Sequence, residues 1–445
     1  MRAQLTQDFR FAPWWWEAAP PPQSREDAPA SSYDHVVIGS GFTGVAAALH
    51  LARGGRSVAL LDAERIGAGA SRRNAGFIGR VMKKSFGDVA DARDEACARE
   101  TYQELHAAYE DVFALAHEEG IACHAARCGR FIAATAPGHR AWLDADLARM
   151  KAALGHDYAI LDPQHQHAAI GSNHYHGGAI IPDSGSIHPG LLHQGLIDRA
   201  IAAGVAAFGE TRVNEIHESD QGVRLETTRG EITAREVVLA TNGYTQHPGW
   251  FKRRLVPFRA FMATTEPLDP ALLDELIPQG RTIIDSNTNI DFFRRAPDAP
   301  RLIFGGATAE KLAGEEAIAA RMRKIMLKAF PQLEDVRLSH VWDGYCAGTF
   351  DMKPHVGQRG RLHYALGYNF AGVALGCRFG KRIADRILGN EPGPSVFDGT
   401  AFPTMPLYTG HPWFIGAAMR YFAWRDAGLA KRWDAAAHRP VDAAA

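Results

Sequence analysis

Three glycines near the start of the sequence have the spacing of a phosphate-binding turn. Gly39, Gly41 and Gly44 form the pattern GxGxxG between an apolar strand and a helix. In such a turn the first glycine permits the tight bend, the second lets the backbone approach a pyrophosphate, and the third lets the helix pack on the strand. The helix N-terminus adds free N–H groups and the positive end of its dipole. This spacing predicts a dinucleotide site, to which Phe42 and Thr43 also contribute.

An acidic residue follows the second strand, at the position that contacts the ribose in dinucleotide-binding folds. Asp62 ends the second apolar strand, 23 residues after Gly39. A carboxylate there accepts hydrogen bonds from both ribose hydroxyls and repels a 2′-phosphate. Its neighbour Ala63 is expected to line the same site. A chance glycine-rich turn is the alternative, but strand, turn, helix (43–53), strand (57–62) and acid occur in the required order.

The loop after this acid distinguishes two dinucleotides. Residues 64–79, "ERIGAGASRRNAGFIG", are rich in small side chains. An NAD-binding fold usually continues from the second strand into a helix without such a loop. The sequence therefore favours FAD, with an NAD-linked dehydrogenase as the alternative.

The composition fits a globular protein of two or three domains. The chain has 445 residues, 46% of them hydrophobic, and a net charge of −1. This balance gives no electrostatic case for nucleic acid or an anionic membrane surface, and no apolar run approaches the ~18 residues of a membrane span. The five cysteines are scattered without a CxxC. We therefore expect no disulfide framework or zinc ribbon, and a cytoplasmic location.

The elements that must position the turn predict an α/β fold. We expect a Rossmann-like FAD-binding domain with an inserted α+β substrate domain built on an antiparallel sheet. Long helices are predicted at about 88–119 and 315–330, the second stopping before Pro331. Three consecutive tryptophans in an irregular N-terminal arm are expected to pack on the body. The expected segments are 1–33 for the arm, 34–85, 188–249 and 341–390 for the discontinuous FAD-binding domain, 86–187 and 250–340 for the substrate domain, and 391–445 for a tail packed on the body.

Six motifs occur along the chain in a specific order. They are "PWWWEAAPPP" before the first strand, "VVIGSGFTG" at the turn, "GAGASRRNAG" in the loop, "VVLATNGYT" in mid-chain, and "VWDGYCAGTFDMKPHVG" and "GYNFAGVALG" near the end. Together they resemble the FAD-dependent oxidoreductases of the D-amino-acid oxidase, glycine oxidase and sarcosine oxidase superfamily. Within it, the sequence is most similar to gamma-glutamylputrescine oxidase-like proteins.

The resemblance implies further contacts to FAD. The loop would pass the pyrophosphate toward the isoalloxazine, and Val213 would lie near the adenine. A helix start at Val373 would face the pyrimidine edge of the flavin, where reduction places negative charge. The other residues that the resemblance assigns to the cofactor are Gly69, Ala70, Ser71, Arg73, Asn74, Ala75, Gly76, Thr241, Asn242, Gly243, Gly344, Gly367, Tyr368, Asn369, Phe370, Ala371 and Gly372.

The implied reaction is oxidation of a C–N bond in a small amine or amino acid, with a gamma-glutamylated amine or a polyamine among the candidates. The carbon would give a hydride to flavin N5, and water would hydrolyse the imine. The flavin would then pass its electrons to oxygen or to another acceptor. A flavin-bearing but non-catalytic or heteromeric subunit is the alternative from a different class.

Four residues are candidates for the substrate side. In "DFFRR" the alternation of a strand places Phe293 and Arg295 on one face. The ring would wall the site, and the guanidinium would bind a carboxylate; an exposed arginine without that role fits Arg295 equally well. Arg80 lies near the place where sarcosine oxidase-like relatives have a carboxylate-binding arginine. Tyr345, in "GYCAG", is the fourth candidate.

Some positions depart from the family pattern. Two lysines of sarcosine oxidase-like relatives are matched here by Ala374 and Ile303, which argues against a simple sarcosine oxidase and leaves the electron acceptor open. Cys346 lies near the position where some relatives bond the flavin covalently. A thiolate there can attack the flavin methyl group, whereas a small buried cysteine is the alternative, and we expect non-covalent FAD. Seven histidines between His156 and His193 come without a metal-binding motif, so we expect no metal site.

Overall fold

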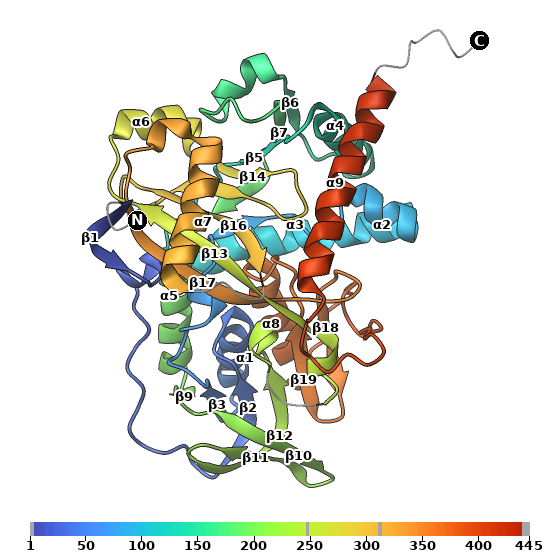
Figure 1. Cartoon of the computed structure of the whole chain (residues 1–445). Helices are drawn as coiled ribbons and strands as arrows, with labels where there is room; N and C mark the ends of the chain where they lie inside the picture. The colour runs from blue at the N-terminus through green and yellow to red at the C-terminus, as the bar shows by residue number, and fades with distance from the viewer. Residues whose placement is uncertain (1–3, 246–248, 310–313, 438–445) are drawn as a thin grey trace.

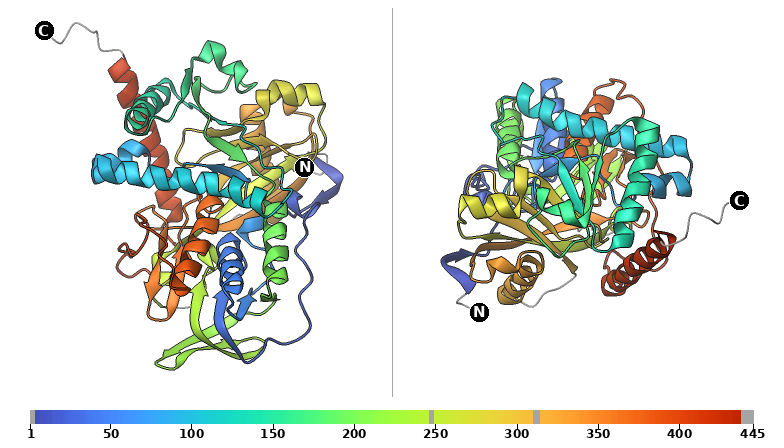
Figure 2. Two further views of the ribbon diagram at one scale, coloured as in Figure 1. Left: turned by 180° about the vertical axis from the view of Figure 1, so that it is seen from behind. Right: turned by 90° about the horizontal axis from the view of Figure 1, so that it is seen from above.

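Two large sheets make up the protein (Figure 1). The computed structural model describes residues 4–245, 249–309 and 314–437. The sheet that carries the glycine turn lies in the lower half of Figure 1, and the second sheet lies above it. The long helix α3 (Glu95–Glu118) crosses between the two halves, as the view from behind shows in Figure 2. This arrangement is the α/β fold that the sequence predicts.

The lower, eight-stranded sheet is parallel at its centre. Its order is β10-β11-β12-β2-β3-β9, and β19 pairs with β12 and with β18. The central strands read "VVI" and "VALL" and are buried, as expected for parallel strands covered on both faces. The bounds are β2 (Ser32–Ile38), β3 (Val58–Leu61), β9 (Ala206–Phe208), β10 (Val213–Ser219), β11 (Gly222–Thr227), β12 (Gly230–Leu239), β18 (His355–Arg359) and β19 (Leu362–Leu366).

Three helices cover this sheet and meet at its phosphate-binding edge. They are α1 (Phe42–Arg53), α5 (Pro189–Ala202) and α8 (Ala374–Ile387). Gly380 of α8 lies against α1 so closely that a Cβ there would be 2.4 Å from the Thr43 carbonyl oxygen. The close approach brings the N-termini of α1 and α8 together, although they lie more than 300 positions apart in sequence.

The second sheet has nine strands in the order β1-β17-β13-β16-β15-β14-β5-β7-β6. It is antiparallel except for the pairs β1–β17 and β14–β5. Its core contains Phe261, Phe293 and Phe304, covered by α7 (Gly314–Ala329). The strand bounds are β1 (Leu5–Arg10), β5 (Arg130–Ala133), β6 (Ala159–Leu161), β7 (Gly178–Ile181), β13 (Val256–Thr265), β14 (Thr282–Asp285), β15 (Phe292–Arg295), β16 (Leu302–Ala309) and β17 (Leu338–Gly348).

Three sequence predictions about elements need correction. The arm is not wholly irregular, because β1 pairs with β17. The helix predicted at 88–119 is two helices, α2 (Phe86–Ala92) and α3, because Asp94 interrupts the first and its carboxylate caps the second, accepting from Cys97 N at 2.7 Å. Residues 341–348, expected in the FAD-binding domain, belong to strand β17 of the second sheet. The division into domains stays a proposal.

The tail forms a long helix on the surface. Helix α9 (Ile415–Ala437) packs on α4 (Pro137–Leu154), where a Cβ on Gly138 would be 2.0 Å from the Ala430 carbonyl oxygen. Figure 1 shows α9 along one side of the molecule, reaching from the lower half to the top. Among the described residues, no helix combines the length and apolar character needed to cross a membrane.

Candidate cofactor and active site

One cavity of about 820 Å³ connects the glycine turn with the second sheet. Its walls come from the β2–α1 turn, the loop after β3, the start of β10, the segment after β12, strand β17 and the loop before α8. Of the residues predicted to bind the cofactor, those that line it are Gly39, Gly41, Phe42, Thr43, Asp62, Ala63, Gly69, Ala70, Ser71, Arg73, Asn74, Val213, Thr241, Asn242, Gly344, Tyr368, Asn369, Phe370, Gly372 and Val373.

The glycine turn has the geometry that its sequence requires. Gly39 has φ +99°, and a Cβ there would be 2.7 Å from the Ala240 carbonyl oxygen. A Cβ on Gly44 would be 1.9 Å from the Gly39 carbonyl oxygen, so only glycine lets α1 start this close to β2. Gly44 therefore shapes the turn from behind and does not line the cavity.

Other residues predicted to bind the cofactor also lie behind the residues that line the cavity. A Cβ on Gly243 would be 2.7 Å from the Cys346 carbonyl oxygen, and one on Gly76 would be 2.3 Å from that of Ile187. The Ala75 carbonyl oxygen accepts from Arg294 at 2.8 Å. The predicted cofactor residues outside the lining are Gly44, Ala75, Gly76, Gly243, Gly367 and Ala371.

Asp62, predicted to bind the ribose, lines the cavity directly after β3. Its Oδ2 accepts from the Ser40 amide at 2.9 Å and from the Ser40 hydroxyl at 2.5 Å, and its Oδ1 accepts from the Glu64 amide at 3.0 Å. Burial raises the pKa of Asp62, and these hydrogen bonds oppose that rise. The carboxylate is thus fixed in orientation, with one of its roughly four acceptor sites left, on Oδ1, for a further donor.

The two helix N-termini meet in the middle of the cavity. The Thr43 hydroxyl of α1 and the Tyr368 hydroxyl before α8 share a hydrogen bond of 2.5 Å. Val373, the residue before α8, lines the cavity with Gly372. A pyrophosphate at the first helix and a flavin edge at the second would both face positive dipole ends. These residues fit FAD, because one cavity of about 820 Å³ is lined by both helix starts.

The loop after β3 is held by buried hydrogen bonds. Arg72 is fully buried, and it donates to the carbonyl oxygens of Ala19 and Pro20, each at 3.0 Å, and to His193 Nδ1 at 3.0 Å. Burial lowers the pKa of Arg72 to about 10. Asn74 closes the loop, because its side chain accepts from Gly76 N at 2.8 Å and donates to Ala70 O at 3.1 Å.

The N-terminal arm contributes to the same loop. The indole of Trp15, fully buried, donates to Asn74 O at 2.8 Å. The guanidinium of Arg73 lies 4.7 Å from the ring of Trp16, which lines the cavity. The predicted packing of the tryptophans on the body is therefore correct, and Trp16 is a cavity residue that the sequence analysis did not assign.

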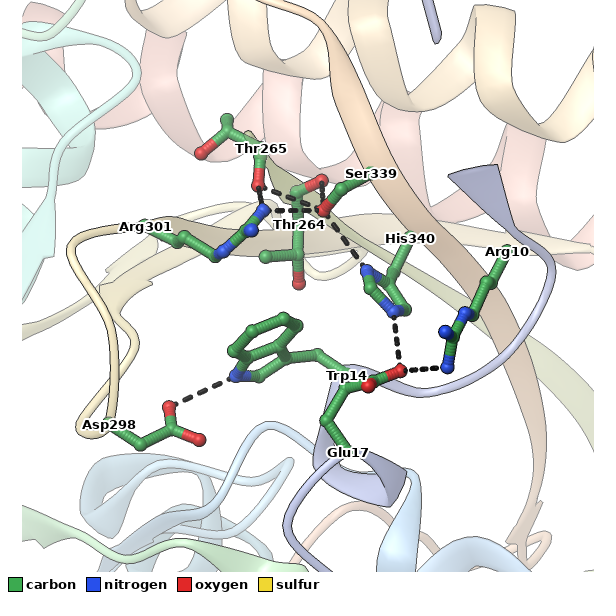
Figure 3. Close-up of polar contacts among 9 residues, drawn as sticks. All are labelled: Arg10, Trp14, Glu17, Thr264, Thr265, Asp298, Arg301, Ser339 and His340. Atoms are coloured by element: carbon green, nitrogen blue, oxygen red, sulfur yellow. Dashed lines mark hydrogen bonds and ion pairs between the residues drawn. The ribbon is translucent and has the colours of Figure 1, made fainter. Parts of the chain in front are cut away.

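Figure 3 shows how the arm is fixed to the second sheet. Trp14 Nε1 donates to Asp298 at 3.0 Å, and the indole lies edge-on to His340 with ring centroids 5.2 Å apart. Arg301 lies 4.6 Å from the same ring and donates to the Ser339 hydroxyl at 2.9 Å. The arm is thus joined to β17 and to the turn before β16 through side chains as well as through β1.

The far end of the cavity lies against β17 and the loop before α8. Tyr345 packs edge-on against Tyr244, with ring centroids 5.5 Å apart. Asn369 and Phe370 both have positive φ, +48° and +78°, which is costly for a residue with a side chain. Phe370 is 44% exposed and lies 5.3 Å, centroid to centroid, from Phe258. The loop therefore holds an aromatic ring open to the cavity.

Of the four substrate-side candidates, only Tyr345 lines this cavity. Phe293 is buried in the core of the second sheet, and Arg295 donates to the Ile277 carbonyl oxygen and to Asp274. The side chains of β15 alternate as predicted, but the face that carries Phe293 and Arg295 is not the face toward the flavin loop. Arg294, on the opposite face, contacts that loop by donating to the Ala75 and Ile187 carbonyl oxygens. The reason is that aromatic residues occupy both faces of β15, so the pattern could not identify the core side.

Arg80 also lies away from the cavity. It is buried and donates to Asp183 Oδ2 at 2.7 Å. His156 Nδ1 lies 3.2 Å from the same oxygen, and His106, His156 and Asp183 form a group that could hold a metal ion. Arg80 already neutralises Asp183, so this group gives no reason to revise the expectation of no metal site.

Several cavity residues are not among those that the sequence predicted individually. Some lie inside the motifs but were not assigned to the site, and the others come from segments without a motif, whose place depends on long-range pairing. An ion pair between Arg259 of β13 and Asp343 of β17 is one example. The lining residues that sequence reasoning missed include Trp16, Ser40, Arg65, Gly67, Thr211, Arg212, Tyr244, Arg259 and Asp343.

Comparison with known proteins identifies the family of this chain. A family profile described as "FAD dependent oxidoreductase" matches residues 34–386. The chain is 30% identical to the probable oxidoreductase OrdL of Haemophilus influenzae, over 85% of this chain and 88% of the relative. It is 28% identical to the gamma-glutamylputrescine oxidoreductase of Escherichia coli, over 84% and 87%. The crystal structure of glycine oxidase from Geobacillus kaustophilus superimposes with a TM-score of 0.68 at 22% identity, covering 85% of this chain and 99% of the other.

The fold, the cavity and these likenesses define an FAD-binding oxidoreductase. The chain belongs to the DAO family of FAD-dependent oxidoreductases, and it is an enzyme whose cofactor is FAD.

Proposed function

We propose that this enzyme oxidises a C–N bond of a small amine or amino acid, and that gamma-glutamylated amines and polyamines are the first substrates to test. The observation that carries the proposal is the single cavity that joins the phosphate-binding turn to the aromatic far end at Tyr345 and Phe370. The relatives named gamma-glutamylputrescine oxidoreductase and glycine oxidase support this substrate class. FAD, when bound, supplies a hydride acceptor at N5.

The chain's own residues would hold the cofactor and shape the reaction space. Asp62 would accept from the ribose hydroxyls. The N-terminus of α8 at Val373 would face the flavin edge that gains negative charge on reduction. Tyr345, Phe258 and Phe370 would wall the substrate and exclude water. The amine would bind in its neutral form, so no dedicated base is required.

We also propose that FAD is bound without a covalent link. Burial raises the pKa of the Cys346 thiol to about 12, so the thiol would stay protonated at neutral pH and would be a poor nucleophile toward a flavin methyl group. Ile303, at the position of one missing lysine, is buried with Trp15 and Trp342 in a small apolar cluster.

An anaerobic screen tests the function. The purified yellow holoenzyme is mixed with gamma-glutamylated amines, polyamines, N-methyl amino acids and D-amino acids, and the flavin absorbance is followed. Bleaching by at least one of these compounds is expected. A yellow protein that none of them bleaches would favour the non-catalytic or heteromeric subunit instead.

A further inference from the structure

Helix α9 is fixed to the body along one face. Asp426 is buried, and its carboxylate accepts from the Thr288 amide at 2.8 Å and from the Thr288 hydroxyl at 2.7 Å. The Asp426 carbonyl oxygen accepts from His139 Nε2 of α4 at 2.9 Å. The view from above in Figure 2 shows α9 at the edge of the molecule. These contacts fix the rotation of α9 about its axis, and they decide which side chains it presents outward.

The outward face of α9 carries large aromatic side chains. Tyr421 is 56% exposed and Trp424 is 72% exposed, and their ring centroids lie 6.0 Å apart on the same side of the helix. Before the helix, Trp413 is 68% exposed and Leu407 is 96% exposed. Outside the cavity, Ile201 is the other exposed large apolar side chain among the described residues. Such a concentration on one surface marks a site of contact.

The same face is cationic. Helix α9 has four basic and two acidic residues, and one of the acids, Asp426, is buried against the body. Arg420 lies four positions before Trp424 and Lys431 lies seven positions after it, so both share the outward stripe of the helix. Both side chains are exposed. In the part of the chain that the structure describes, no carboxylate oxygen lies within 4.0 Å of the Arg420 guanidinium.

An anionic lipid surface matches this combination of side chains. Tryptophan and tyrosine favour the headgroup level of a bilayer, where the ring is in an apolar environment and its N–H or O–H reaches water. Arginine and lysine place their stems along apolar surface and their charges at the lipid phosphates. The net charge of the whole chain is −1, but screening limits the attraction to charges close to the lipid. The local charge of α9 therefore decides.

A second copy of the chain matches this face less well. A two-fold contact brings the same surface of both copies together. Arg420 and Lys431 of each copy would then enter one interface, and between these two residues the only acid is the buried Asp426. Like charges brought together in this way oppose association. The charge of the outward face thus favours lipid over self-association.

We propose that the outward face of α9, together with Trp413, docks the enzyme on the surface of an anionic lipid bilayer. The helix would lie in the plane of the bilayer, with the Tyr421 and Trp424 rings among the headgroups and the two cations at lipid phosphates. Helix α9 lies outside residues 34–386, the span that matches the family. The docking surface is thus separate from the cofactor site, and the inference does not depend on the substrate.

Co-sedimentation with vesicles tests the docking. The yellow holoenzyme is centrifuged with vesicles of phosphatidylcholine alone, and with vesicles that contain phosphatidylcholine and phosphatidylglycerol in equal amounts. We expect the enzyme to sediment with the anionic vesicles, less completely as the salt concentration rises, and to stay in solution with the neutral ones. No binding to the anionic vesicles, or equal binding to both compositions, overturns the proposal.

The double variant Arg420→Gln/Lys431→Gln tests the cations. Each basic side chain near an anionic surface contributes to binding, so we expect the loss of two to weaken it by about twentyfold. Arg56→Gln/Arg235→Gln is the matched control, because it removes two exposed cations far from α9 in sequence and changes the net charge equally. An equal loss in the control would mean attraction by overall charge, and it would overturn the role of α9.

The double variant Tyr421→Ser/Trp424→Ser tests the aromatic rings. We expect anionic vesicle binding to weaken by about tenfold, at low and at high salt, in a protein that is still yellow. Ile201→Ser, at an exposed apolar position on α5, should bind as the wild type does. Unchanged binding in the aromatic variant overturns the proposal.

Light scattering of the free proteins distinguishes lipid from a second copy. We expect the wild type and Tyr421→Ser/Trp424→Ser to have the same mass in solution. A wild type of twice the mass of this variant, without binding to the anionic vesicles, would make the face a contact between copies and would overturn the proposal.

Discussion

The indole N–H of Trp15 donates a 2.8 Å hydrogen bond to the carbonyl oxygen of Asn74. The bond joins the N-terminal arm to the loop that follows the nucleotide-binding strands. Asn74 itself lines the cavity, so the arm is part of the support of the cofactor site. Trp342 makes a parallel contact, donating to the Arg73 carbonyl oxygen at 2.9 Å.

Trp15→Phe should therefore loosen FAD binding. The substitution keeps an aromatic ring but leaves the Asn74 carbonyl oxygen without its donor, a loss of about 1 kcal/mol or about fivefold in affinity. Fluorescence titration of apoprotein with FAD measures the change. Trp413→Phe, at an exposed position on the tail, is the control, and an equal effect there would contradict the role given to the arm.

Gly44→Ala should abolish flavin binding. The new Cβ would lie 1.9 Å from the Gly39 carbonyl oxygen, so α1 could not start where it does. We expect a colourless or insoluble protein. Gly428→Ala on α9 meets no atom within 4 Å and should be yellow. A soluble, yellow Gly44→Ala protein with normal FAD content would show that the turn is not as tight as described.

His193 should make the protein sensitive to acid. It is fully buried, accepts from Arg72 and donates to Ser40 O at 2.6 Å, and burial lowers its pKa to about 3. A proton binds the His193 imidazole less readily in the folded protein than in the unfolded chain, where a histidine has a pKa of about 6.5. Acid therefore favours unfolding, and the stability present above pH 6.5 is lost as the pH falls from 6.5 toward 3.

His193→Gln tests this dependence. The amide can donate to Ser40 O and accept from Arg72, but it does not titrate. Thermal unfolding at pH 7.5 and pH 5 should show a smaller loss of midpoint temperature in the variant than in the wild type. His167→Gln, at an exposed position, should lose as much as the wild type. Equal losses in all three proteins would rule out His193 as the cause.

Cys346→Ser should leave the flavin content unchanged. The raised pKa of this thiol argues against a covalent bond. After acid precipitation the yellow colour should appear in the supernatant for both the wild type and the variant. Colour that stays in the wild-type pellet and leaves the Cys346→Ser pellet would instead demonstrate a covalent link.

The parts of the site that the sequence could predict are those in which the backbone demands a particular residue. Gly39 and Gly44 are such cases, since a Cβ at either position collides with backbone atoms. The parts it could not predict depend on which segments pair over long distances. Arg259 reaches the cavity only because β13 pairs with β17, and no local pattern encodes that pairing. Asp94, by contrast, is a local signal for the break before α3, because an aspartate is a preferred N-cap residue.

The pairing of β1 with β17 has a consequence for the order of assembly. Leu5 lies opposite Leu338, so the arm emerges from the ribosome long before its partner strand exists. At about 5–20 residues per second, the delay is on the order of half a minute. During that time Trp15 lacks Trp342, its partner in a buried apolar cluster, so its hydrogen bond to Asn74 is not yet fixed by packing. Cofactor capture is thus tied to the synthesis of β17, and a nascent chain should stay colourless until that strand has been made.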